Sequence, residues 1–172
     1  MIFLYVISLV VFAFDQVTKW LVKTRMVEGQ DQISVIGDFF TIVSHRNRGA
    51  AFGILQGQTT FFLIVTVIFL VGIVYYMHRM RKEGRLLVPV ALSLMLGGAF
   101  GNFLDRAIQG EVVDFMQFVF RIGDWVYPFP IFNVADSGIV IGAMLVMLDT
   151  LIQWRKEIKR EAVAKEANHD HA

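Results

Sequence analysis

Long apolar stretches alternate with more polar segments along the chain. A helix needs about 20 mostly apolar residues to cross a hydrocarbon core about 30 Å thick. The stretches that meet this requirement cover residues 2–22, 59–77, 86–104 and 131–152. The pattern predicts an all-α membrane protein, in which a bundle of four transmembrane helices forms a single domain over residues 1–172.

The first apolar stretch lies where a signal peptide would lie, but it differs from one in composition. It lacks a basic leading segment, and Asp15, Gln16 and Lys19 interrupt what should be an uncharged apolar core. We therefore expect this stretch to be retained as the first membrane-spanning helix.

The composition indicates that the surroundings of the protein are largely lipid. Hydrophobic residues make up 56% of the 172 residues and the mean hydropathy is +0.58, which is more than a soluble domain of this size can bury. The chain contains no cysteine, which excludes disulfide bonds, thiolate metal sites and a cysteine nucleophile. The net charge of +1 gives no sign of a nucleic-acid partner, and we expect none.

The distribution of basic residues predicts which side of the membrane each segment faces, because cytoplasmic loops are enriched in Lys and Arg. Basic residues are concentrated between the second and third stretches and in the C-terminal segment, at Arg79, Arg81, Lys82, Arg85, Arg155, Lys156, Lys159, Arg160 and Lys165. We therefore expect both termini, including the tail 153–172, to be cytoplasmic. Segments 23–58 and 105–130 then face outward.

The two outer segments differ in their patterns. Residues 33–43 approximate a two-residue apolar period around Gly37, which predicts a small extracytoplasmic β element, a hairpin. Residues 112–129 are rich in aromatic side chains, and we expect them to form an amphipathic outer segment at the membrane interface. Prolines end that segment, so the fourth helix is expected to begin near Ile131.

Polar residues gather near the outer ends of three predicted helices. With a rise of about 1.5 Å per residue, Asp15 lies roughly 10 Å inside the first helix and Asp136 roughly 8 Å inside the fourth. Spacings of three or four residues place side chains on one helix face. The sets that share a face are Asn102 with Asp105 and Arg106, Asn133 with Asp136, and Asp15 with Lys19. A bundle hides such polar stripes by turning them toward each other.

These polar residues have two interpretations. The neighbours that can form ion pairs, and so only hold helices together, are Asp15 with Lys19 and Asp105 with Arg106. Asp136 has no basic residue within one turn of its helix, and Asp114 has no adjacent cation. Two carboxylates without local counter-charges at similar depth favour a chemical role.

Five short motifs occur in order along the chain. They are Phe14-Asp15-Gln16-Val17-Thr18-Lys19, Asn47-Arg48-Gly49-Ala50-Ala51-Phe52, Gly101-Asn102-Phe103-Leu104-Asp105-Arg106, Val112-Val113-Asp114-Phe115 and Phe132-Asn133-Val134-Ala135-Asp136-Ser137. The ordered set, which extends to about residue 153, resembles the lipoprotein signal peptidase family, also called signal peptidase II. Each motif alone is weakly specific, whereas the five together are highly specific.

The resemblance implies an intramembrane aspartyl endopeptidase of the bacterial inner membrane, with its active site toward the extracytoplasmic side. Asp114 and Asp136 are implied to be the catalytic dyad. The residues implied to support the site or bind the substrate are Asp15, Lys19, Asn47, Gly49, Asn102, Asp105, Arg106 and Asn133. The implied substrate is a prolipoprotein that carries a diacylglyceryl cysteine and is cut on the amino side of that cysteine.

The same resemblance implies membrane lipid as a partner, and neither a cofactor nor a metal. One chain supplies every motif, so we expect a monomer. A serine mechanism would use Ser44 or Ser137 with Lys19 or Lys23 as the base, but no serine and lysine share a helix face at the outer level. Metal catalysis is disfavoured because no paired His–Glu ligand spacing occurs.

Two non-proteolytic functions complete the alternatives. A proton or ion pathway also uses acidic residues within a membrane, but it should continue through the bilayer, and few polar residues lie between the outer level and Asp149. A lipoprotein-binding chaperone would keep lipid selectivity but would tolerate replacement of its aspartates by asparagine.

Overall fold

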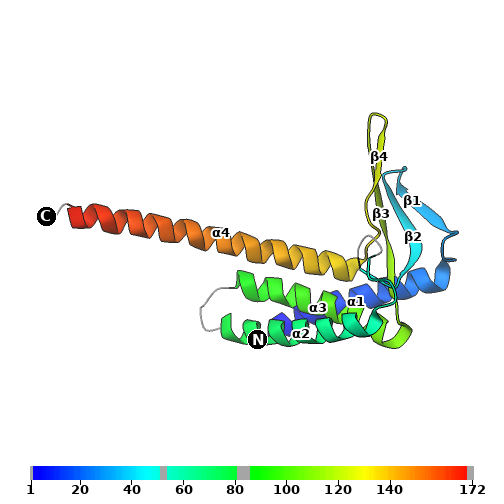
Figure 1. Cartoon of the computed structure of the whole chain (residues 1–172), viewed down its shortest axis with the longest axis horizontal. Helices are drawn as coiled ribbons and strands as arrows, with labels where there is room; N and C mark the ends of the chain where they lie inside the picture. Colours follow the sequence, from blue (N-terminus) through cyan, green and yellow to red (C-terminus); the bar gives the residue numbers. More distant parts are fainter. Residues whose placement is uncertain (1, 51–53, 81–85, 170–172) are drawn as a thin grey trace.

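Four long helices form a bundle, and a small sheet crosses one end of it (Figure 1). The computed structural model describes residues 2–50, 54–80 and 86–169, the last eight of these by their backbone alone. Within these ranges the helices are α1 (Ile2–Arg25), α2 (Thr59–Met80), α3 (Leu87–Gln109) and α4 (Val134–His169). Each is long and apolar enough to cross a membrane, in α4 over Val134–Glu161. The prediction of four helices long and apolar enough to span a membrane is therefore confirmed.

The sheet is antiparallel and joins the two long segments that lie between helices. Its strands follow one another in the order β1 (Gln32–Ile36), β2 (Phe40–Asn47), β3 (Val112–Ile122) and β4 (Trp125–Pro128). The β1–β2 hairpin confirms the element predicted around Gly37. The aromatic segment, which the sequence predicts to be amphipathic, forms β3 and β4. Its pairing with β2 joins residues about 70 positions apart, for example Asn47 and Val112, so local periodicity does not reveal it.

The last helix begins three residues later than the sequence predicts. Phe132 is still part of the extended chain, because its backbone exchanges hydrogen bonds with Met116 of β3, at 2.8 and 3.1 Å. Helix α4 then starts at Val134. The predicted depth of Asp136 is therefore wrong, since this residue lies in the first turn of α4 and faces the sheet end of the bundle. At the other end, α4 extends well beyond the other helices (Figure 1).

Glycines allow α3 to approach both α1 and α4 closely. A Cβ atom at Gly97 would overlap the backbone carbonyl oxygen of Ser8 in α1, and one at Gly98 would overlap that of Ala135 in α4. Small residues are common where membrane helices pack, because lipid provides no hydrophobic drive for their association. The close approach brings short polar side chains on three helices within reach of one another.

The sheet is held against α1 by a small apolar cluster. Val22 and Met26 of α1 pack with Val113 and Phe115 of β3, and all four are buried. Side chains alternate between the two faces of a strand. Because Val113 and Phe115 point toward α1, the side chain of Asp114 between them points to the opposite face of β3. On that face it meets the polar side chains near the start of α4.

The absence of cysteine makes the predicted membrane orientation testable by site-directed labelling. Asp124 lies in the turn between β3 and β4, Glu157 lies on the far part of α4, and both are exposed. We expect Asp124→Cys to react with a membrane-impermeant maleimide in intact cells and Glu157→Cys to react only after permeabilisation. The opposite pattern would show that the sheet end faces the cytoplasm.

Candidate active site

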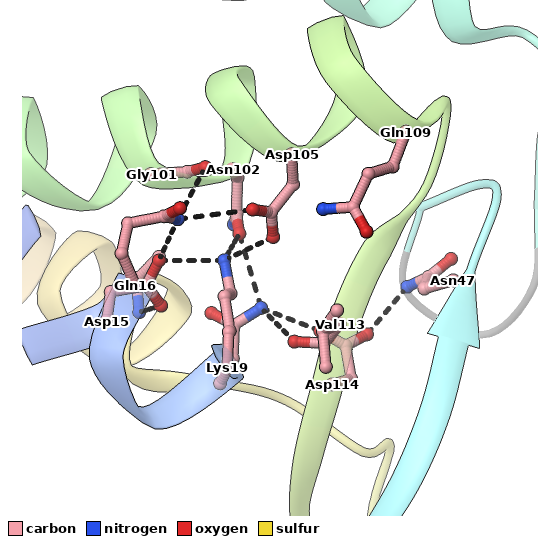
Figure 2. A network of polar contacts seen from close by, with 12 residues as sticks. Asp15, Gln16, Lys19, Asn47, Gly101, Asn102, Asp105, Gln109, Val113 and Asp114 are labelled. Carbon is pink, nitrogen blue, oxygen red and sulfur yellow. Dashed lines mark hydrogen bonds and ion pairs between the residues drawn. The ribbon is translucent and has the colours of Figure 1, made fainter. Parts of the chain in front are cut away.

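A buried lysine binds carboxylates from two helices. The Lys19 Nζ atom of α1 lies 2.8 Å from Asp15 Oδ2 and 2.9 Å from Asp105 Oδ2 of α3, and it donates a 2.8 Å hydrogen bond to Asn102 Oδ1. Figure 2 shows these contacts converging between the two helices. The Asp15–Lys19 pair is as the sequence suggests. Asp105, however, pairs with Lys19 on another helix, whereas the sequence suggests the adjacent Arg106.

Arg106 binds the loop that follows β2. Its Nη2 atom donates a 2.9 Å hydrogen bond to the carbonyl oxygen of Gly49, and its guanidinium carbon lies 4.7 Å from the centre of the Phe62 ring. The Gly49 N–H in turn donates to Asn47 Oδ1 at 2.9 Å. A Cβ atom at position 49 would overlap the backbone oxygen of Ile54. Glycine is therefore required for the loop to close against Arg106.

The start of α4 carries reciprocal capping hydrogen bonds. Asn133 Oδ1 accepts from the N–H of Asp136 at 2.9 Å, and Asp136 Oδ2 accepts from the N–H of Asn133 at 3.2 Å. This arrangement is a capping box, which satisfies N–H groups that the first helical turn leaves unpaired. Asp15 Oδ1 accepts from the N–H of Ala135 at 2.8 Å. The negative charge of Asp15 also interacts favourably with the positive end of the helix dipole.

Asp114 is buried in β3 and is bound by two amides. Asn47 Nδ2 donates to its Oδ2 at 3.0 Å and Asn133 Nδ2 donates to its Oδ1 at 2.7 Å; only 2% of Asp114 is exposed. Burial, and to a smaller extent the charge of Asp136, raise the pKa of Asp114 to about 7. The hydrogen bonds from both asparagines act in the opposite direction, because they stabilise the carboxylate.

Asn133 links the two aspartates implied to be catalytic. It donates to Asp114 through its side chain and to Asp136 through its backbone. Asn102 Nδ2 gives Asp136 a second donor, with a 2.7 Å hydrogen bond to Oδ1. Both carboxylates are thus oriented by amides from different elements, and both line the same cavity.

This cavity has a volume of about 620 Å³ and two contrasting parts. The polar residues at one end are Asn47, Asn102, Arg106, Asp114, Asp136 and Ser137. The rest of the wall is apolar and includes Phe129, Pro130, Ile131, Ile139, Val140, Ile141 and Met144. Since Val140, Ile141 and Met144 follow α4 toward the other end of the bundle, the cavity suits a ligand with a polar part and a long apolar part.

The structure brings together all ten residues that the sequence analysis assigns to the site. Five line the cavity, namely Asn47, Asn102, Arg106, Asp114 and Asp136. The other five lie behind that wall, where they bind the lining residues or one another. They are Asp15, Lys19, Gly49, Asp105 and Asn133. Among the residues that the structure describes, no three His, Cys, Asp or Glu side chains are grouped to hold a metal ion.

Gln16 is a further member of the polar network that sequence reasoning did not assign to the site. Its Nε2 atom lies 3.1 Å from Asp105 Oδ1 and 3.2 Å from Asp15 Oδ2, as Figure 2 shows. An amide next to a carboxylate in the middle of an apolar stretch is the signal in the sequence that could have identified it. Gln16 therefore helps to bind the two carboxylates that Lys19 pairs with.

The chain is similar to known proteins over most of its length. The model of the signal peptidase (SPase) II family matches residues 7–152. The lipoprotein signal peptidase of Bacillus pumilus is 49% identical over 154 residues, which are 90% of this chain and 96% of the relative. That of Bacillus subtilis is also 49% identical, over 91% of this chain and 98% of the relative. Two solved structures described as bacterial membrane enzymes superpose with TM-scores of 0.77 and 0.75 at 44% identity. Each covers 88% of this chain, and the match covers 88% and 94% of the respective solved chains.

The double role of Asn133 is separable by substitution. Asn133→Ala removes both the helix cap and the donor to Asp114, whereas Asn133→Ser keeps an acceptor at the cap position but removes that donor. We expect Asn133→Ala to be less stable than Asn133→Ser by about 1 kcal/mol, measured as thermal unfolding in the same detergent. Equal unfolding temperatures for the two variants would contradict a capping role.

Proposed function

The chain belongs to the signal peptidase II family, and from this membership we propose that it removes the signal peptide from prolipoproteins by an aspartyl mechanism. The observation that carries the mechanism is the pair formed by the buried Asp114 and the half-buried Asp136, which share Asn133 as a donor and face one cavity. The family name supports proteolysis, and the geometry supports these two carboxylates as the groups that perform it.

Two neighbouring carboxylates in a buried site do not both remain ionised, so they hold one proton between them. The ionised member removes a proton from a water molecule, and the resulting hydroxide attacks the carbonyl carbon of the scissile peptide. The protonated member donates a hydrogen bond to the oxygen that becomes negatively charged. When the tetrahedral intermediate collapses, the C–N bond breaks and the base returns the proton taken from water to the amine of the new N-terminal cysteine.

The two-part cavity supports a lipid-modified substrate. The apolar wall along α4, with Val140, Ile141 and Met144, suits a diacylglyceryl group, while the polar end suits a peptide backbone. Anchoring the lipid in the membrane would hold the scissile bond at the level of the aspartates, so that binding itself orients the reaction. One chain supplies every residue of this site, and we propose that the active unit is a monomer.

The local contacts weaken the serine alternative. The hydroxyl of Ser137 donates to the backbone oxygen of Asn133 at 3.0 Å within the first turns of α4. Lys19, the buried candidate for a base, already contacts three acceptors. A general base needs a free acceptor for the proton of serine, and the Lys19 Nζ atom is engaged by two carboxylates and an amide oxygen.

The dyad is tested by replacing each carboxylate with its isosteric amide. We expect Asp114→Asn and Asp136→Asn each to lower the cleavage of a diacylglyceryl prolipoprotein in reconstituted membranes by at least about a hundredfold, because proton transfer is lost. Asp124→Asn is the matched control, since Asp124 is exposed in the β3–β4 turn, and it should cleave at the wild-type rate. Full turnover by either dyad variant in folded protein would refute the aspartyl mechanism.

Lipid-directed recognition is tested by comparing a diacylglyceryl precursor with its unmodified form. Each buried CH2 group contributes about 0.8 kcal/mol, so we expect loss of the acyl chains to raise KM by more than about a hundredfold. The measurement is the initial rate of signal-peptide release over a range of precursor concentrations in the same vesicles. Equal KM values would mean that the apolar wall does not bind the lipid.

A further inference from the structure

Lys19 is buried behind the cavity and touches none of the reacting groups directly. It is 3% exposed, and it is not among the described residues that line the cavity. Its contacts are with Asp15 in its own helix and with Asp105 and Asn102 in α3. An ammonium group has three N–H donors and no acceptor. Each of the three partners of Lys19 must therefore present an acceptor oxygen to it.

This requirement fixes the orientation of the Asn102 amide. Because Lys19 can only donate, Oδ1 of Asn102 must face it, at 2.8 Å. The Nδ2 atom is then directed the other way, where it donates to Asp136 Oδ1 at 2.7 Å. Asn133 Nδ2 also donates to Asn102 Oδ1 at 3.2 Å, which agrees with the same orientation. If the Asn102 amide were reversed, an oxygen would face the carboxylate of Asp136 and repel its charged form.

We propose that Lys19 is a positioning residue that locks the Asn102 amide with its N–H toward Asp136 and so makes Asp136 the base of the reaction. This inference rests on the proposed function and deepens it, because it assigns a separate role to each aspartate. Asp136 removes the proton from water, and Asp114 carries the proton that stabilises the oxyanion. Lys19 acts only through Asn102 and through its charge.

The environment of Asp114 fits the role of the protonated partner. Its burial and the charge of Asp136 raise its pKa to about 7, so it keeps a proton up to near-neutral pH. The other charged groups around Asp114 and Asp136 come from two elements: Lys19 and Asp15 from α1, and Asp105 and Arg106 from α3. Removal of the positive charge of Lys19 destabilises the carboxylate forms of the pair, so both should hold their protons to higher pH.

The test compares Lys19→Met with Lys23→Met by the pH dependence of signal-peptide release. Lys23 lies one turn further along α1, is exposed, and binds Gln109, so its replacement should leave kcat and the pH profile unchanged. For Lys19→Met we expect kcat to fall about tenfold or more, as for loss of a hydrogen bond to a charged group. We expect KM to be unchanged, and both limbs of the profile to move upward by at least about half a pH unit.

A second variant guards against misfolding, because Lys19→Met leaves Asp15 and Asp105 without their cation. Lys19→Met combined with Asp105→Asn removes one charge of each sign and should still move both limbs upward, though by less, because the loss of the Asp105 charge partly offsets the loss of the Lys19 charge. A residue that only stabilises the fold would lower the unfolding temperature without moving either limb. Wild-type kcat and an unshifted profile in a folded Lys19 variant would overturn the proposal.

The outcome of this test is separable from that of the proposed function. If Asp114→Asn and Asp136→Asn are inactive and the Lys19 variants behave as wild type, only the role of Lys19 is wrong. If the dyad variants remain active, the aspartyl mechanism fails whatever the Lys19 variants do.

Discussion

The ion pairs of Lys19 with Asp15 and Asp105 are the interaction on which the site depends. A charged group within a membrane-spanning segment is costly unless it is paired and hydrogen-bonded. Here one ammonium, at 2.8 and 2.9 Å from two carboxylates, allows three charges to be buried between α1 and α3. Asp15 then has one oxygen left to bind the first turn of α4 through Ala135. The cluster therefore fixes the relative positions of the three helices that carry the polar end of the cavity.

Close packing is what makes short side chains sufficient for this network. A Cβ atom at Gly101 would lie 2.5 Å from Asp15 Oδ2, so a larger residue would displace that carboxylate. A Cβ atom at Gly98 would overlap the backbone oxygen of Ala135, so a larger residue there would push α4 away from α3. At this separation Asn102 reaches Asp136 with a 2.7 Å hydrogen bond. The small residues of α3 thus serve the chemistry as well as the packing of the bundle.

From the sequence alone, the membrane-length helices and the residues that gather at the site are predicted better than the contacts that those residues make with one another. Apolar length defines the four helices, and helical spacing brings Asn102, Asp105 and Asp136 to one end. Local spacing does not show that Asp105 pairs with Lys19, because that contact crosses between helices. The pairing of β2 with β3 is likewise non-local. The sequence also holds a signal for the observed start of α4, since Asn133 followed three residues later by Asp136 is a capping-box pattern. The prolines before it favour an earlier start, and the structure follows the capping box.

The balance of burial against amide donors explains how this cavity can hold a single proton near neutral pH. Burial alone favours the neutral form of Asp114, and a site with two neutral carboxyls has no base. Amide donors alone favour the charged form, and a site with two carboxylates has no acid. Asp114 receives donors from Asn47 and Asn133 and still has a pKa of about 7, so the desolvation is only partly offset. The apolar wall of the cavity contributes to that desolvation, and the same surface is suited to a lipid. In the proposed mechanism, one feature would therefore both bind the lipid of the substrate and adjust the acidity of Asp114.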